Sequence, residues 1–210
     1  VNKRFDDSIR LSYSKTEIVG SAEEILHPIV RCALEIVGID TGIEITSIAD
    51  IPSNTGLGSS SAFAVGLLNA LYAYKGVFRS AAQLAEEACK IEIDMLKEPI
   101  GKQDQFAAAF GGFNCITFNS DESVFVEPII CPNELKDDLN QNLIMFYTGV
   151  TRSSGSILKE QKKNTVINTE SLTEMRDTTD EFKRIITSGK NLNSIGELLD
   201  KGWKMKRNLA

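Results

Sequence analysis

The spacing of hydrophobic residues changes along the chain from alternating to helical and back, as in proteins that mix strands and helices. Residues 3–19 alternate roughly between apolar and polar, which predicts a pair of strands. In residues 25–37 the apolar positions recur every three to four residues, with Pro28 near the start and Gly38 just beyond the end. Proline suits the first turn of a helix and glycine its end, so this segment predicts a helix.

The next segment predicts a strand followed by three helices. Residues 43–50 alternate as a strand does, whereas residues 62–74 are apolar on nearly every side, which indicates a buried helix. Ser80 suits the N-cap of a further helix. Asp104 is expected to begin a short helix that Gly111 ends.

The second half of the chain is expected to contain a hairpin, a domain boundary and a strand. Residues 114–118 and 124–127 flank a polar turn and predict the hairpin. Residues 133–141 are polar with little to bury, which favours a boundary, and residues 143–147 predict a strand. Beyond residue 153 the spacing is helical. We therefore expect an α+β protein with two domains, residues 1–135 and 136–210.

Composition narrows the class of protein. The 210 residues are 42% hydrophobic and 25% charged, which is typical of a globular protein. The net charge of −6 argues against nucleic acid or anionic membrane surfaces as partners. The four cysteines show no Cys-x-x-Cys spacing and there is a single histidine, His27, so a zinc site or a histidine-dependent triad is not expected. These features, and the lack of a leader or membrane span in the sequence, predict a cytoplasmic protein.

The segment before the buried helix has the chemistry of an anion site. It reads Pro52-Ser-Asn-Thr-Gly56-Leu57-Gly58-Ser59-Ser60-Ser61. Two glycines allow a tight turn and close approach to a ligand, and the N–H groups of the helix start favour an anion. The segment is not a Walker A loop, because no lysine follows the second glycine, and Ser61 replaces the third glycine of a dinucleotide fingerprint. A structural cap is the alternative.

Pro-x-x-x-Gly-Leu-Gly-Ser-Ser-x-Ala resembles the phosphate-binding motif of the GHMP kinases, the superfamily of galactokinase, homoserine kinase and mevalonate kinase. Downstream, Glu92 and the residues at 99–106 and 110–114 resemble the sugar kinase branch. Within that branch the likeness is greatest to the D-glycero-D-manno-heptose 7-phosphate kinases, and it extends over nearly the whole chain.

The resemblance implies a two-domain GHMP kinase fold. Its N-terminal domain, similar to ribosomal protein S5 domain 2, would span residues 1–135 and lack its first strands. Residues 136–210 would be part of the C-terminal domain. An early sugar-holding motif and a late glycine-rich loop of the superfamily are not found, so we expect a fragment whose isolated activity is an open question.

The resemblance also implies the ligands and the roles of individual residues. The cofactors would be ATP and Mg²⁺, and Ser60 and Glu92 would hold the metal. Asp104 would act on the acceptor hydroxyl. The triphosphate would be bound by the loop residues Pro52, Gly56, Leu57, Gly58, Ser59, Ser60 and Ser61.

Three of these residues also have structural interpretations. Glu92 has apolar helical neighbours, so it needs a partner, either a metal ion or a buried ion pair. Asp104 at a helix start is compatible with simple capping. Arg152, in the stretch Thr-Gly-Val-Thr-Arg-Ser-Ser, could grip a substrate phosphate or form a structural salt bridge.

The expected function is therefore ATP-dependent phosphorylation of a sugar or sugar phosphate. The resemblance points to the anomeric hydroxyl of D-glycero-D-manno-heptose 7-phosphate. Galactokinase-like or fucokinase-like activity and a non-catalytic nucleotide-binding module are the alternatives. The sequence predicts no oligomeric state.

Overall fold

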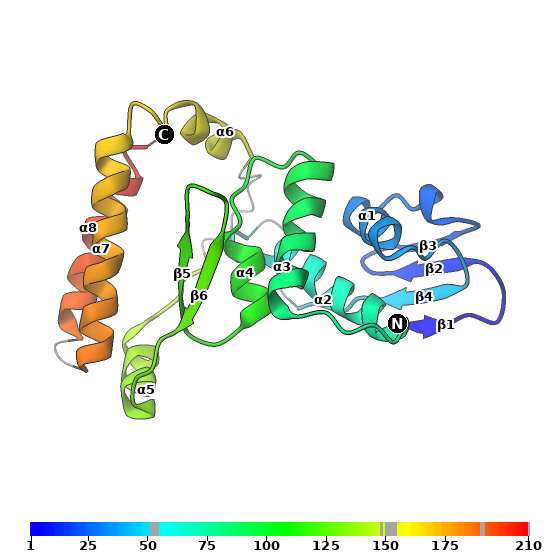
Figure 1. Cartoon of the computed structure of the whole chain (residues 1–210), viewed down its shortest axis with the longest axis horizontal. Helices are drawn as coiled ribbons and strands as arrows, with labels where there is room; N and C mark the ends of the chain where they lie inside the picture. Colours follow the sequence, from blue (N-terminus) through cyan, green and yellow to red (C-terminus); the bar gives the residue numbers. More distant parts are fainter. Residues whose placement is uncertain (51–54, 148, 150–154, 190–191, 210) are drawn as a thin grey trace. The chain divides into compact units, whose positions relative to one another are not determined.

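The computed structural model describes residues 1–50, 55–147, 149, 155–189 and 192–209 (Figure 1). Pro52 and Arg152 lie outside the described residues. The chain forms two compact units, Val1–Gly111 and Gly112–Ala210. They divide at the paired glycines 111 and 112, earlier in the chain than the boundary expected after residue 135.

The first unit is built on a four-stranded sheet. Its strands are β1 (Asn2–Lys3), β2 (Ile9–Ser12), β3 (Thr16–Val19) and β4 (Ile43–Thr46). They lie in the order β1-β4-β2-β3 (Figure 1). β2 and β3 form an antiparallel hairpin with Ile9 opposite Val19, and β2 pairs with β4 in parallel. The predicted strand pair and the strand from residue 43 are confirmed.

Helix α1 (Pro28–Val37) follows a short 3₁₀ turn, η1 (Ala22–Glu24). Pro28 occupies the first helical position, and Gly38 ends the helix with φ of +69°, a conformation that glycine adopts without strain. The apolar stripe of α1 joins the inward side chains of the strands in one core. Its most buried members include Ile9, Leu11, Val30, Leu34, Ile43 and Ile45.

Three further helices complete the first unit: α2 (Ser59–Tyr74), α3 (Ala81–Cys89) and α4 (Gln103–Phe110). Ser80 caps α3 through a capping box with Gln83, as the sequence predicted. From Lys90 to Met95 the helix continues as a π-helical segment, η2, which the spacing did not indicate. α2, α3 and α4 pack against one another.

The start of α4 differs from the prediction. Lys102 is the N-cap and Gln103 the first helical residue, so Asp104 lies in the first turn instead of capping it. A carboxylate is favourable there because of the helix dipole, without a capping hydrogen bond. Gly111 ends the helix, as predicted.

The second unit contains the predicted hairpin, β5 (Asn114–Phe118) and β6 (Val124–Pro128). Its helices are α5 (Asn133–Asn142), α6 (Gly155–Lys163), α7 (Thr169–Ser188) and α8 (Asn193–Lys206). α7 and α8 lie side by side (Figure 1). A small core joins Leu135 of α5 to Ile186 and Ile195.

Two stretches of the second unit differ from the sequence interpretation. The polar residues 133–141 form helix α5, because Leu135 and Leu139 give this stretch an apolar stripe that packs on the core. Residues 143–147 are not a strand, and their side chains are exposed. A strand needs a neighbouring backbone to pair with, and the described part of this unit provides only the β5–β6 pair.

Candidate active site

The glycine-rich loop leads directly into the first turn of α2. Gly56 and Gly58 have φ of +76° and +68°, which only glycine adopts readily, and Gly58 is the N-cap residue. The N–H of Ala62 donates to the carbonyl of Gly58 at 2.9 Å, which begins the helical hydrogen-bond ladder. The backbone N–H groups of the preceding turn have no carbonyl four residues earlier in the helix to bind, so they can bind an anion.

Asp104 approaches this loop from another helix. A Cβ atom built on Gly58 would lie 3.2 Å from Cγ and Oδ2 of Asp104. The Asp104 side chain itself is exposed. A carboxylate is therefore available to solvent directly beside the start of α2, as an acceptor-activating role would need.

The three serines of the motif differ in exposure. Ser60 is exposed and Ser59 is half-buried, whereas only 3% of Ser61 is exposed. The hydroxyl of Ser60 donates to Oε1 of Glu92 at 2.5 Å. Because the O–H of Ser60 points to Glu92, the lone pairs of the hydroxyl oxygen are oriented away from the carboxylate and can bind a cation.

Glu92 is a buried carboxylate, with 2% of its surface exposed, and it lies in the π-helical segment. Besides Ser60, the carboxamide Nε2 of Gln105 donates to Oε2 of Glu92 at 2.6 Å. Both donors are neutral, so neither of these two hydrogen bonds pairs the carboxyl group with a cation. The burial expected from its apolar neighbours is confirmed.

Gln105 has no role in the sequence interpretation, and the structure adds it to the site. It is fully buried beside Asp104 on α4. The only sequence signal is that Gln105 is the last polar residue before the apolar run Phe106–Phe110 of α4. That signal does not reveal the partner, because Glu92 comes from a different helical segment.

The donor set at Ser60 and Glu92 fits a magnesium ion bound together with a nucleotide. Mg²⁺ typically takes one or two protein carboxylates and completes its coordination with phosphate oxygens and water. Within the described ranges, no three or more His, Cys, Asp or Glu side chains cluster as a metal site. Glu92 and Ser60 contribute one carboxylate and one hydroxyl, which suits an ion shared with a nucleotide better than a cage of protein ligands.

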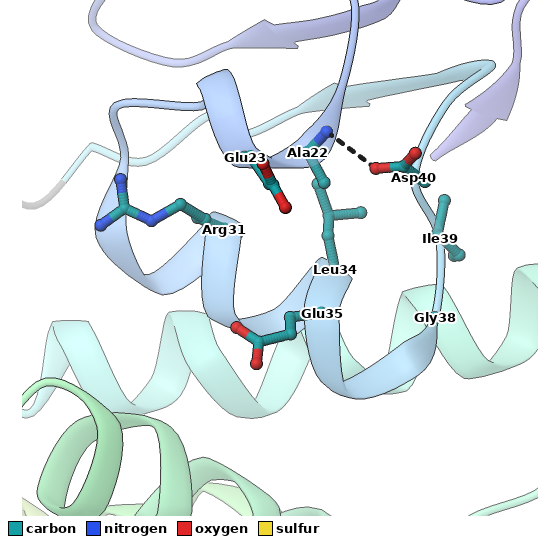
Figure 2. A pocket seen from close by; sticks show the side chains of 8 residues that line it. All are labelled: Ala22, Glu23, Arg31, Leu34, Glu35, Gly38, Ile39 and Asp40. Carbon is teal, nitrogen blue, oxygen red and sulfur yellow. Dashed lines mark hydrogen bonds between the residues drawn. The ribbon is translucent and has the colours of Figure 1, made fainter.

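A pocket elsewhere in the first unit is not part of this site. The cavity has a volume of about 460 Å³ and is lined by residues of η1, α1 and the turn after α1. Figure 2 shows these lining residues. Leu34 and Ile39 contribute the apolar surface of the cavity, and Arg31 and acidic side chains surround it. Asp40 Oδ1 accepts a hydrogen bond from the N–H of Ala22 at 3.4 Å. None of the described candidate site residues lines this pocket.

Residues 24–112 match the model of the GHMP kinases N terminal domain. The chain carries a GHMP kinase N-terminal domain. The loop, Glu92, Asp104 and Gln105 all lie within it. Residues of this domain that are far apart in sequence therefore form a single cluster around the start of α2.

Curated proteins that are similar to this chain include sugar kinases. The chain is 30% identical over 162 residues to a D-glycero-alpha-D-manno-heptose 7-phosphate kinase of Campylobacter jejuni, covering 76% of this chain and 47% of the relative. It is 31% identical over 114 residues to a galactokinase of Pyrococcus furiosus, covering 54% of this chain and 31% of the relative. The chain thus spans about half the length of the heptose kinase.

Solved structures agree on the fold. A D-glycero-D-manno-heptose 1-phosphate kinase from Bacteroides thetaiotaomicron superposes with a TM-score of 0.76 at 20% identity, covering 98% of this chain and 65% of that one. The mevalonate kinase of Methanococcus jannaschii gives a TM-score of 0.69 at 19% identity, covering 99% and 68%. The α+β GHMP kinase fold is therefore confirmed. No helix in the described ranges has both the length and the apolar character of a bilayer span.

Proposed function

We propose that this GHMP kinase chain carries the nucleotide site of an ATP- and Mg²⁺-dependent sugar kinase. The single observation that carries the proposal is the convergence on the first turn of α2. Asp104 lies against Gly58, and Glu92 accepts a hydrogen bond from Ser60 two residues further on. A nucleotide-holding loop, a metal-binding pair and an acceptor-directed carboxylate are the parts that phosphoryl transfer requires.

The loop binds the triphosphate. Gly56 and Gly58 keep side chains away from the approach path, and the N–H groups at Ser59, Ser60 and Ser61 donate to phosphate oxygens. Ser61 contributes through its backbone, because its side chain is buried. Pro52 and Leu57 complete the proposed loop, and Pro52 lies outside the described residues.

Ser60 and Glu92 hold Mg²⁺, which neutralises charge on the phosphates when it is bound. Glu92 supplies the negative charge, and the Ser60 hydroxyl supplies lone pairs while its O–H continues to donate to Glu92 Oε1. Burial excludes water from the inner side of the carboxylate. Glu92 consequently gains most from a cation on the side that Ser60 faces.

Asp104 acts on the acceptor hydroxyl. A nucleophile in phosphoryl transfer needs alignment and modest proton relief more than covalent assistance. The exposed carboxylate of Asp104 lies beside the N-cap of α2, where a hydroxyl can approach the terminal phosphate. It accepts a hydrogen bond from that hydroxyl, orients it and takes its proton.

The acceptor we propose is the anomeric hydroxyl of D-glycero-D-manno-heptose 7-phosphate. The similarity to the Campylobacter heptose kinase, over 76% of this chain, supports this choice. Arg152 is proposed to bind the substrate's own phosphate through its guanidinium group. The similarity to galactokinase, and to an L-fucokinase of Bacteroides fragilis at 27% identity over 80% of this chain and 18% of the relative, makes galactose and fucose the comparison substrates.

The test is a substrate panel with ADP release as the readout, made in Mg²⁺ on the intact protein. Heptose 7-phosphate is expected to give the highest kcat/KM, above galactose and fucose. Turnover of galactose or fucose, without turnover of heptose 7-phosphate, would show that the proposed substrate is wrong and that galactose or fucose takes its place. Nucleotide binding without turnover of any sugar would indicate a non-catalytic module.

A further inference from the structure

Gln105 makes one unusually informative contact. Its side chain is fully buried, and its Nε2 donates to Glu92 Oε2 at 2.6 Å. Its Oε1 is also buried, and it has no hydrogen-bond partner among the residues that the structure describes. A buried carbonyl oxygen left unpaired is unfavourable, so an apolar side chain of similar length would fill this space more stably. Packing therefore does not explain why an amide occupies this position, whereas its hydrogen bond to Glu92 does.

Gln105 and Ser60 hold the Glu92 carboxylate from both sides. Ser60 donates to Oε1 and Gln105 to Oε2, so each oxygen of the carboxylate accepts one hydrogen bond. Two such bonds fix the rotation of the carboxylate. Each oxygen keeps further acceptor capacity.

The charge of the donor also matters. A lysine or arginine at this position would fix the carboxylate equally well, but it would neutralise it and compete with a metal ion. A carboxamide cannot ionise, so it orients Glu92 without removing its charge. Gln105 also follows Asp104 on α4, so one short helix carries both the acceptor-directed carboxylate and the amide that holds Glu92.

We infer that Gln105 is a positioning residue that holds the Glu92 carboxylate in the orientation needed for the Mg²⁺–nucleotide complex. This inference rests on the proposed function. Gln105 acts through Glu92 and touches neither nucleotide nor metal. Removing its amide leaves Glu92 Oε2 without its donor and frees the carboxylate to rotate away from Ser60.

The test is titration calorimetry of ADP in Mg²⁺ and in EDTA, which needs no turnover. The variant is Gln105→Met, with Gln103→Met, an exposed residue of the same helix, as the matched control. In Gln105→Met we expect the gain in affinity that Mg²⁺ gives to fall by about 10- to 100-fold, the usual effect of losing a group that orients a metal ligand. Affinity in EDTA should not change, and Gln103→Met should match the wild type in both buffers.

A second variant and a double-mutant cycle keep the test decisive if Gln105→Met fails to fold. Gln105→Glu keeps the size of the side chain but places a second carboxyl against Glu92, so it should also lower the Mg²⁺ dependence. In a double-mutant cycle, Ser60→Ala should lose much of its effect when Gln105 is already Met, because both act on one carboxylate.

The outcomes separate the two proposals. If the wild-type protein binds ADP equally well in Mg²⁺ and in EDTA, the proposed metal site and this inference are both overturned. A wild-type protein that depends on Mg²⁺, with Gln105→Met and Gln105→Glu depending on it equally, overturns the role of Gln105 alone. A lower thermal midpoint with unchanged Mg²⁺ dependence does the same, because it is the result of a purely structural role.

Discussion

The backbone of Gly58 lies against the carboxyl group of Asp104, so closely that a Cβ atom on Gly58 would come within 3.2 Å of Cγ and Oδ2 of Asp104. The contact joins the start of α2 to the first turn of α4. It places the proposed phosphate loop and the proposed acceptor-directed carboxylate side by side. A substitution at Gly58 therefore tests both parts at once.

Gly58→Ala should destabilise the protein and impair turnover. Alanine is strained at the observed φ of +68°, at a cost of about 1–2 kcal/mol, and its methyl group would also displace Asp104. The free energy of unfolding from urea titration measures the first effect, and kcat the second.

Gly66→Ala is the control for that substitution. Gly66 is exposed in the middle of α2, and a Cβ there meets nothing within 4 Å. Alanine should stabilise the helix at this site by about 0.5–1 kcal/mol and leave kcat unchanged. Equal effects of the two substitutions would show that the Gly58–Asp104 contact has no special importance.

The proposed role of Arg152 predicts a selective loss of activity. Arg152→Ala should lower kcat/KM for heptose 7-phosphate. The loss corresponds to about 2–5 kcal/mol of transition-state stabilisation if the pair of guanidinium and substrate phosphate is desolvated. Turnover of the unphosphorylated heptose should not change. Steady-state kinetics with the two sugars measure the difference. Equal losses on both would instead indicate the structural salt bridge.

The four cysteines should react in two groups. Burial raises the pKa of the Cys89 thiol to about 12, and burial also raises the pKa of Cys32. Cys115 and Cys131 are partly exposed. Because the thiolate is the reactive form, an aromatic disulfide reagent should label Cys115 and Cys131 in the native protein, and Cys32 and Cys89 only in urea. Rapid native labelling of Cys89, located by peptide mass spectrometry, would contradict its burial.

His27 should make stability depend on pH. Its ring contacts Tyr13 and Phe63, and burial lowers its pKa below 6.5, although the nearby Glu17 carboxylate opposes the shift. Below about pH 6.5 the unfolded chain binds a proton that the folded chain resists, so stability falls as pH decreases through this range.

The measurement for His27 is the free energy of unfolding between pH 7.5 and about 5.5, in the wild type and in His27→Gln, a range chosen to lie above the usual carboxyl pKa values. The wild type should lose more stability than the variant over this range. Parallel curves would mean that His27 does not contribute.

The elements that could be predicted from the sequence are those whose signals are local. The apolar stripe, Pro28 and Gly38 define α1 within a single segment, and Ser80 with Gln83 defines the start of α3. The glycine–serine loop also predicts an anion site from a local pattern, and that site stays a proposal. The family resemblance then supplied roles for Glu92 and Asp104 that spacing alone left open.

What could not be predicted depends on contacts between segments. The π-helical geometry around Glu92 has no spacing of its own, and the bond from Gln105 joins α4 to that segment. Lys102, and not Asp104, occupies the N-cap position of α4, without a side-chain capping hydrogen bond, so the preference of Asp for that position did not decide where the helix begins. Residues 143–147 look like a strand, but pairing, which the local pattern does not encode, decides whether one forms.

The central claim is that Asp104, held beside the phosphate loop, acts on a sugar hydroxyl. The most direct measurement is sugar-dependent ADP release by the wild type and Asp104→Asn in Mg²⁺, with ATP affinity and thermal midpoint determined on the same samples. Asparagine keeps the shape and gives up only a helix-dipole contribution of about 0.3–1 kcal/mol. We predict that kcat falls by about 10²–10⁴-fold, the range for a positioned acid or base, while ATP affinity and the midpoint barely change. A near-normal kcat in a normally stable Asp104→Asn protein would contradict the account.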